Sequence, residues 1–305
     1  MVKWGKNVMA ESQSTQVGTF VEHQLDRLAA VIGNRLSADV IAIYGPIYPG
    51  ADTRVRQAIE AHKGKRRPKL AVVLDTGGGI IEVVERMVNT IRYHYSEVVM
   101  IVPDRAMSAG TVFAMSGDAI MMDYYSCLGP IDPQVETSDG KLLPALSYLI
   151  QYKRLKETEA GKLTDAEVIL LQKLDLAELH SFEEAQKLSD TLLQEWLAKY
   201  KFKEWKKTET RRLDVTEEMR KERALAIAKQ LADCETWHSH GRPISMATLT
   251  HDLKLKIADF ASDDIGLKGP VAEYHEFLRD YMGKIAAFHF VHAKGICLFY
   301  TWSAK

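Results

Sequence analysis

Two short segments of the sequence combine residue types that could form and stabilise a covalent acyl intermediate. Gly77–Gly79 follow the apolar run 70–74 and precede a helical pattern, so their backbone N–H groups are expected at a helix N-terminus, where an oxyanion can be held. Ser108 follows the next apolar run, 98–102, and precedes small residues. A hydroxyl beside backbone donors is the outline of an acyl-transfer site. Two simpler readings stay open, a tight glycine turn and a serine that caps its helix.

The sequence predicts no cofactor and no metal. The glycine triplet has neither the G-x-x-x-x-G-K-[ST] spacing of a P-loop nor the G-x-G-x-x-G spacing of a dinucleotide site. The three cysteines are widely spaced, which argues against a disulfide framework and a cysteine-built zinc site. His238, His240 and His251 have no acidic partner at a diagnostic spacing, so we interpret them as polar loop or interface residues.

The elements that must position these segments read as an α/β fold with a mainly parallel sheet. The run 70–74 is apolar without alternation, which is typical of a strand covered on both faces. A helix over about 80–95 and a strand over 98–102 complete a right-handed βαβ unit. Ligands bind at the carboxyl ends of strands in such sheets, so both segments are expected at one edge. The same pattern predicts strands over 38–44 and 119–122, and a helix over about 19–36.

The second half of the chain reads as a helical extension. Residues from about 146 to 223 are charged and rich in helix formers, and capping boxes predict helix starts at Thr164 and Ser181, with a further start beside Thr216. The apolar segment 285–302 is interpreted as two strands around a Lys294-Gly295 turn. We therefore expect a core over 1–150. The region 151–305 is expected to be a helical extension with a C-terminal strand pair, packed on the core or on a neighbouring subunit.

Charge and hydropathy exclude some partners. Forty basic against forty-one acidic residues give a net charge of −1, so no global field would draw the protein to nucleic acid or to an anionic membrane. The basic and aromatic run 196–212 could suit nucleic acid, but a solvated amphipathic helix is the favoured interpretation. No apolar stretch has signal-peptide length, and Lys294 interrupts the most apolar segment. The expectation is a cytoplasmic protein with no nucleic-acid partner and no membrane insertion.

Three motifs, in order along the chain, resemble the serine dehydrogenase proteinase family, a relative of the Clp and signal peptide peptidase A serine peptidases with the ClpP/crotonase fold. They are Asp75–Gly79, Pro103–Thr111 and Leu128–Gln134. The similarity covers roughly residues 35–150, and Trp237–Ile244 resembles a later family segment.

This resemblance implies a serine peptidase that acts on a peptide or protein and assembles as a homo-oligomer. Ser108 would be the nucleophile, and the amides of Gly78 and Ala109 would form the oxyanion hole. The sequence has Thr-Gly-Gly-Gly where the family commonly has Thr-Pro-Gly-Gly, and Ser-Ala-Gly where it has Ser-Gly-Gly. Both changes keep the backbone donors.

The general base is the open question in the sequence. The histidine of Clp peptidases corresponds roughly to Asp132, and no histidine lies between His94 and His180. Relatives of the signal-peptide-peptidase type use a desolvated lysine instead. Lys141 and Lys153 are the nearest candidates, and Lys153 is favoured because a helix can aim it.

Two other functions remain as alternatives. A crotonase-type acyl-CoA enzyme shares the oxyanion hole but needs no nucleophile, and Ser108 argues against it. A non-catalytic oligomeric scaffold that kept the fold and lost its base is the second alternative.

Overall fold

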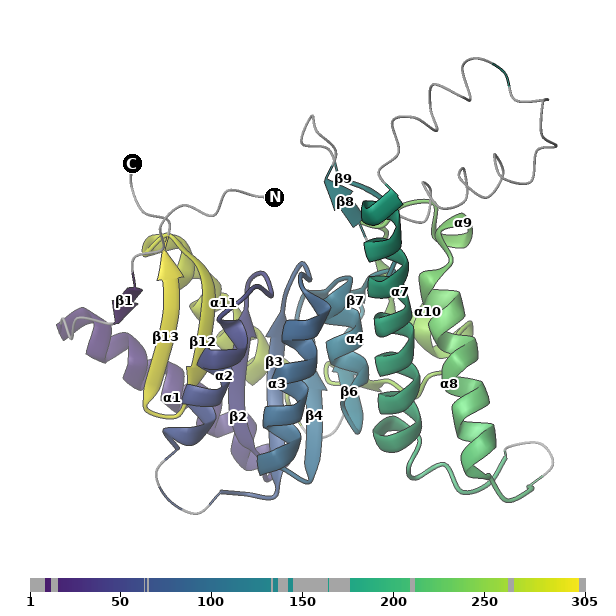
Figure 1. Ribbon diagram of the computed structural model, residues 1–305. Helices are drawn as coiled ribbons and strands as arrows, with labels where there is room; N and C mark the ends of the chain where they lie inside the picture. Colours follow the sequence, from purple (N-terminus) through teal and green to yellow (C-terminus); the bar gives the residue numbers. More distant parts are fainter. Residues whose placement is uncertain are drawn as a thin grey trace.

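The computed structural model describes residues 9–11, 16–62, 64, 66–132, 134–136, 142–144, 164, 176–208, 212–262 and 266–301. In these residues a central sheet carries helices on both faces, and a group of helices packs against one end of the sheet (Figure 1). The expected α/β architecture is confirmed.

The main sheet has eight strands among the described residues, in the order β1-β13-β12-β2-β3-β4-β6-β11. Five neighbouring strands, from β2 to β11, run parallel, and the other three are joined antiparallel at one end. The parallel strands are β2 (Asp39–Tyr44), β3 (Lys69–Asp75), β4 (Glu97–Ile101), β6 (Ala119–Met122) and β11 (Ala258–Asp259).

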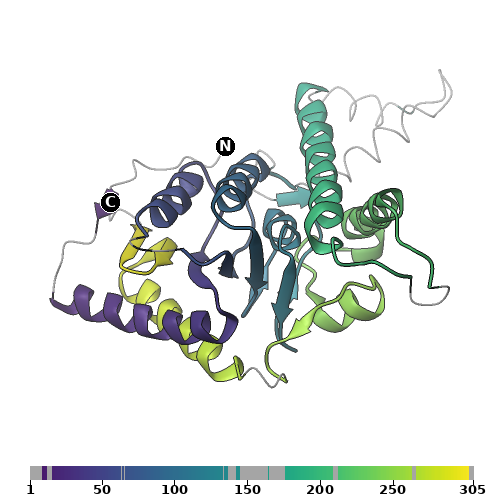
Figure 2. The same ribbon diagram turned by 90° about the horizontal axis from the view of Figure 1, so that it is seen from below.

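Helices cover both faces of the sheet, which explains the unbroken apolar runs. On β3, Val72 and Leu74 face one side of the sheet, whereas Ala71 and Val73 face the other. The first side is covered by α2 (Ala51–Glu60), α3 (Ile81–His94) and α4 (Ala109–Met115). The second side is covered by α1 (Gln16–Leu36) and α11 (Lys268–Lys284), which lie next to each other in Figure 2.

The C-terminal segment belongs to the main sheet. Strands β12 (Ala287–Ala293) and β13 (Ile296–Thr301) flank Lys294-Gly295, so the expected strand pair is confirmed. Strand β12 pairs antiparallel with β2, and β1 (Met9–Glu11) pairs with β13. The end of the chain therefore closes one side of the same sheet that carries the glycine and serine segments.

The described residues form two small sheets in addition to the main sheet. Strands β5 (Arg105–Ala106) and β7 (Cys127–Leu128) are parallel, and β10 (Ile244–Ser245) pairs antiparallel with β7. The other small sheet is the antiparallel pair β8 (Gln134–Glu136) and β9 (Leu142–Pro144). Because β10 lies more than a hundred residues after β7, the first small sheet brings a distant segment next to β7, which separates it from β5.

The helical extension contains α7 (Leu176–Trp196), a π-helical turn η1 (Leu197–Lys201), α8 (Glu217–Ala232), α9 (Cys234–Trp237) and α10 (Met246–His251). The expected start beside Thr216 is confirmed, because its side chain accepts a hydrogen bond from the Met219 N–H. The expected start at Ser181 is wrong. Helix α7 already includes the residues from Leu176 onward and continues through Ser181, because the preceding Leu-Ala-Glu-Leu favours helix.

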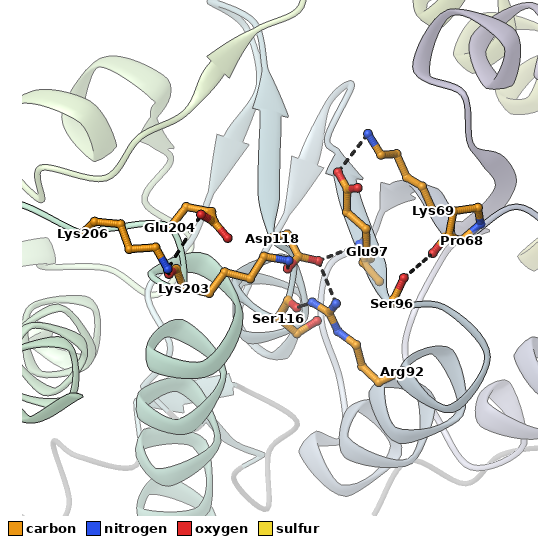
Figure 3. Close-up of polar contacts among 11 residues, drawn as sticks. Pro68, Lys69, Arg92, Ser96, Glu97, Ser116, Asp118, Lys203, Glu204 and Lys206 are labelled. Atoms are coloured by element: carbon orange, nitrogen blue, oxygen red, sulfur yellow. Dashed lines mark hydrogen bonds and ion pairs between the residues drawn. The ribbon is translucent and has the colours of Figure 1, made fainter. Parts of the chain in front are cut away.

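Asp118 joins the extension to the core. Its buried carboxylate accepts hydrogen bonds from Arg92 of α3 (2.7 Å) and from the Val98 N–H (2.7 Å). The ammonium of Lys203, just after η1, lies 2.5 Å from its other oxygen. Figure 3 shows the two cations meeting on this one carboxylate from opposite sides. The extension therefore packs on the core of its own chain, as the buried contacts of Leu193 and Leu197 also show.

Candidate active site

Ser108 has a strained backbone at the start of α4. Its φ of 53° and ψ of −123° lie in a region that residues with a side chain rarely adopt. Such a conformation costs about 1–3 kcal/mol and is concentrated at functional sites. No side-chain hydrogen bond from Ser108 caps α4. The helix-cap interpretation of this serine is therefore not supported.

The glycine loop and the serine turn are joined by a short parallel ladder. The Thr76 N–H donates to the Arg105 carbonyl (2.9 Å), and the Met107 N–H donates to the Thr76 carbonyl (3.0 Å). These bonds continue the parallel order of β3 and β5 past the end of the main sheet. Because both segments leave neighbouring strands at the same edge, the two motifs converge as the sequence predicted.

Gly78 touches Ser108 directly. Its φ is 97°, and a Cβ added to it would lie 2.8 Å from the Ser108 Cβ and 2.6 Å from the Met107 carbonyl oxygen. Both the backbone conformation and the contact distance therefore require glycine. The loop backbone can approach the serine only because this position lacks a side chain.

The two expected oxyanion donors, the N–H groups of Gly78 and Ala109, differ in whether they already donate a hydrogen bond. Among the described residues, no acceptor takes the Ala109 N–H, which lies at the first position of α4. The Gly78 N–H donates to Thr76 Oγ1 at 3.0 Å. One donor is therefore available beside Ser108, and the other is held by a hydroxyl two residues away.

The Thr111 side chain anchors α4, the helix that follows the Ser108 turn, to neighbouring segments. Its buried hydroxyl lies 2.8 Å from the carbonyl oxygens of both Ala106 and Gly129, which compete for its one proton, and it accepts from the Gly129 N–H at 2.9 Å. These contacts tie α4 to β5 and to the segment after β7. The helix that follows Ser108 is therefore held against two neighbouring segments.

A carboxylate and an imidazole from distant parts of the chain meet at the segments that adjoin β7 and β10. Asp132 follows β7 and is almost fully buried, and its Oδ1 lies 3.0 Å from Nδ1 of His240. His240 precedes β10, which pairs with β7, and β7 in turn pairs with β5. The three short strands therefore place the Asp132–His240 pair on the side of the sheet edge where β5 leads into Ser108. An imidazole held by a carboxylate through Nδ1 is the orientation that leaves Nε2 for proton transfer.

A model of the ClpP-like SDH-type serine proteinases matches residues 35–213, more than half of the chain. The chain belongs to this family. The expected family resemblance and the fold that it implied are thereby confirmed.

The individual relatives of this chain are more distant. The chain is 34% identical over 99 residues to the uncharacterized protein MJ0137, and 33% identical over 100 residues to the uncharacterized protein MJ1495, both of Methanocaldococcus jannaschii. The matches span about a third of the length of these relatives, 32% and 31%. Two structures of the 1510-N membrane-bound stomatin-specific protease, one of them with a substrate peptide, are also similar. They are 21% and 22% identical at a TM-score of 0.32, and cover 38% of this chain and 58% and 57% of theirs.

The expected general base, Lys153, lies outside the described residues, as does Lys141. The Asp132–His240 pair was missed, because its histidine was interpreted as a loop residue. The resemblance of Trp237–Ile244 to a family segment was the signal that could have found it. In the described ranges, no helix has both the length and the apolar character needed to cross a bilayer.

Behind the glycine loop lies a second group of titratable residues. Burial raises the pKa of Asp75 to about 6, although Arg279 lies 3.2 Å from its Oδ2. Atoms of Asp75, Asp104 and His275 that could bind a metal ion lie within 4.8 Å of one another. Burial also lowers the pKa of His275, whose Nδ1 lies 2.9 Å from the Tyr44 hydroxyl. Because the Arg279 guanidinium already supplies a positive charge to Asp75, we assign no metal to this group.

Proposed function

We propose that this SDH-type proteinase hydrolyses peptide bonds through an acyl-enzyme formed on Ser108. The observation that carries the proposal is the contact between the strained Ser108 turn and Gly78, with the Ala109 N–H available beside the serine. Neither a helix cap nor a packing role requires this combination. It is the arrangement that an oxyanion next to a nucleophile needs.

The chemistry follows from these positions. The Ser108 hydroxyl oxygen attacks the peptide carbonyl carbon, its proton passes to the base, and the carbonyl oxygen becomes an oxyanion that the Ala109 N–H binds. The Gly78 N–H is the second donor, and it reaches the oxyanion when its bond to Thr76 Oγ1 is exchanged. The base then gives the proton to the leaving amine, and water cleaves the ester in a second round. Removal of one oxyanion donor typically costs about 10²–10³ in rate.

We assign the base to His240, with Asp132 as the residue that orients it. The pair is formed, its carboxylate is buried, and the position of Asp132 is the one where Clp peptidases carry histidine. The second carboxylate oxygen of Asp132 is buried and has no hydrogen-bond partner in the described part of the chain. Lys153 stays the sequence-based alternative, and it is distinguished by mutation.

The proposal also covers the substrate class, the oligomeric state and the location of the protein. We infer a peptide or protein substrate, a homo-oligomer and a cytoplasmic location. The helical extension packs against the core beside α4, and we infer that it limits access to the acyl-enzyme. Excluding bulk water from an active site strengthens its electrostatic interactions.

Fluorophosphonate labelling of the full chain tests the proposal. We expect one covalent adduct by intact mass, located on Ser108, and its loss in Ser108→Ala. The matched control is Ser96→Ala, because Ser96 is an exposed serine that donates to the Pro68 carbonyl. Folded protein that gives no adduct, or an adduct that persists in Ser108→Ala, would contradict the peptidase and favour a non-catalytic scaffold.

A further inference from the structure

The basic run after α7 uses most of its lysines in ion pairs. Four of the five lysines between positions 199 and 207 have a carboxylate within 4.0 Å. Their pairs are Lys199–Glu195, Lys203–Asp118, Lys206–Glu204 and Lys207–Asp214. The expected solvated amphipathic helix accounts only for Lys199, because Lys203, Lys206 and Lys207 follow η1 outside any helix and Lys203 pairs with a buried carboxylate.

Lys201 is different. No carboxylate of the described chain lies within ion-pair distance of it, and its ammonium donates to the Lys256 carbonyl at 2.5 Å. Burial and the nearby Lys256 lower the pKa of Lys201 to about 8. Lys201 is also the last residue of the π-helical turn η1. Such turns occur frequently at functional sites.

Lys201 borders an open cavity of about 860 Å³ between η1, α8 and the segment after α10. Three further cations line the cavity, and for none of them does the described structure show an ion pair. They are Arg223, Lys254 and Lys256. Arg223 donates only to the Leu253 carbonyl, at 2.5 Å. The single acidic residue in the described wall is Glu204, which is exposed and lies 3.9 Å from Lys206.

Gathering four cations around one cavity carries an electrostatic cost, which a bound anion would offset. The backbone of Lys254 adds to this cost, because its φ of 49° is unfavourable for a residue with a side chain. A protein that needed only surface charge for solubility would disperse these residues. The arrangement instead matches an anion site built from flexible ammonium groups and one guanidinium.

Two aromatic side chains form part of the same wall. The rings of Phe202 and Trp205 meet edge to face, with centroids 5.9 Å apart, and both residues line the cavity. Nucleic-acid bases stack on aromatic rings with a gain of about 1–3 kcal/mol per base. The wall therefore offers cations for a phosphate and a ring surface for a planar base.

We propose that this cavity binds a mononucleotide, with its phosphate among Lys201, Arg223, Lys254 and Lys256 and its base against Trp205. Small-molecule sites typically enclose about 300–1,000 Å³, so the cavity suits one nucleotide with room for solvent. The site is separate from the Ser108 turn. Its binding test is therefore independent of peptidase activity.

Isothermal titration of the full chain with adenosine monophosphate tests the proposal. We expect one site per chain with a dissociation constant in the micromolar to millimolar range. Lys201→Gln and Lys254→Gln should each weaken binding about tenfold, the loss of one charge-assisted hydrogen bond. Lys254 is exposed, so its variant is expected to fold normally. The matched control is Lys199→Gln, which removes a lysine that is already paired with Glu195 and should leave affinity unchanged.

Adenosine, inorganic phosphate and a ten-residue oligothymidylate show which part of the ligand the cavity recognises. Adenosine should bind at least about tenfold more weakly than the monophosphate, because it lacks the charged group. Inorganic phosphate binding as tightly as the monophosphate would overturn the role of the ring. A ten-residue oligothymidylate that binds much more tightly than thymidine monophosphate would overturn the mononucleotide assignment in favour of a single strand. Two results would overturn the site itself. One is the absence of any heat or fluorescence change with adenosine monophosphate at 5 mM, and the other is a loss of affinity in Lys199→Gln as large as that in Lys201→Gln and Lys254→Gln.

Discussion

Asp132 and His240 lie 108 residues apart in the sequence, yet Asp132 Oδ1 is 3.0 Å from His240 Nδ1. The carboxylate is almost completely buried, and the imidazole is largely covered. The contact depends on β10 pairing with β7, because that pairing returns the chain from the helical extension to the edge of the serine turn. In the proposed mechanism, this contact completes a serine, histidine and aspartate set in which the aspartate precedes the histidine.

His240→Ala is expected to slow fluorophosphonate labelling of Ser108 by about 10²–10⁴-fold, the usual contribution of a general base. Asp132→Asn should slow it as well, because the imidazole loses the carboxylate that orients it. His238→Ala is the matched control, since His238 is an exposed histidine two residues away and should label at the wild-type rate. Equal rates for His240→Ala and His238→Ala would remove His240 from the mechanism.

Lys153→Ala separates the histidine base from the lysine base. If His240 is the base, Lys153→Ala keeps the labelling rate within a few-fold of wild type. Complete loss of labelling in Lys153→Ala, with labelling intact in His240→Ala, would give the role to the lysine. Lys141→Ala is the control for a nearby lysine in the same sequence region.

Thr76→Val should speed acylation several-fold. Thr76 Oγ1 accepts the Gly78 N–H in the resting structure, so this bond must be given up when the amide binds an oxyanion. Valine keeps the shape of threonine but removes the hydroxyl that accepts the Gly78 N–H. In the variant this N–H has no acceptor before the reaction and gains one, the oxyanion, in the transition state, so the barrier to acylation falls. Single-turnover labelling rates measure the effect, with Thr76→Ser as the control that retains the hydroxyl. A slower reaction in Thr76→Val would show that the hydroxyl positions the loop instead.

Asp118→Asn is expected to destabilise the protein near neutral pH by about 3–5 kcal/mol, because Arg92 and Lys203 lose a buried partner. Burial alone would raise the pKa of Asp118, but hydrogen bonds from Lys203 and Arg92 outweigh it and hold the pKa below its usual value. This contribution is present above the unfolded-state pKa and is lost as pH falls through the folded-state pKa. The deficit of the variant should therefore shrink on acidification.

Urea unfolding of wild type and Asp118→Asn between neutral and acidic pH measures this effect. Asp214→Asn is the control, because Asp214 pairs with Lys207 at 2.6 Å but is mostly exposed. Its loss should cost at most about 1 kcal/mol. A destabilisation of Asp118→Asn no larger than that of the control would mean that this carboxylate does not hold the extension on the core.

Asp75→Asn should show the opposite pH dependence. Burial raises the pKa of Asp75 to about 6 in the folded protein, so the folded state binds the proton more tightly than the unfolded state. The associated stability is present below the unfolded-state pKa of 3.8 and is lost as pH rises through about 6, a change of up to about 3 kcal/mol. Asparagine does not ionise, so the variant should gain stability relative to wild type across this window. A constant difference between the two proteins from pH 4 to pH 7 would contradict the raised pKa.

Local pattern was sufficient for the part of the site between positions 70 and 111. Unbroken apolar runs predicted buried parallel strands, and the glycine triplet and Ser108 followed two of those strands. Parallel neighbours end at one edge, so their convergence needed no knowledge of side-chain packing. The requirement for glycine at position 78 became clear only in three dimensions, because it depends on the distance to the Ser108 Cβ.

The capping box at Ser181 shows where local pattern was insufficient. The residue types fit a helix start, yet α7 already includes the residues before Ser181, which also favour helix. A capping motif describes one local option, and the energy of the whole helix decides between options.

The sequence by itself determined the fold class, the family and the convergence of Ser108 with the glycine loop, because these depend on residue type and on short-range periodicity. Only the tertiary structure decided that Asp132 meets His240 and that β12 closes the sheet against β2. It also decided that Lys201, unlike its neighbours, has no carboxylate partner in the described part of the chain. Contacts between residues this far apart arise from the packing of many elements at once. No periodicity within a short window carries that information, because each pairing is stabilised by surfaces contributed from elsewhere in the chain.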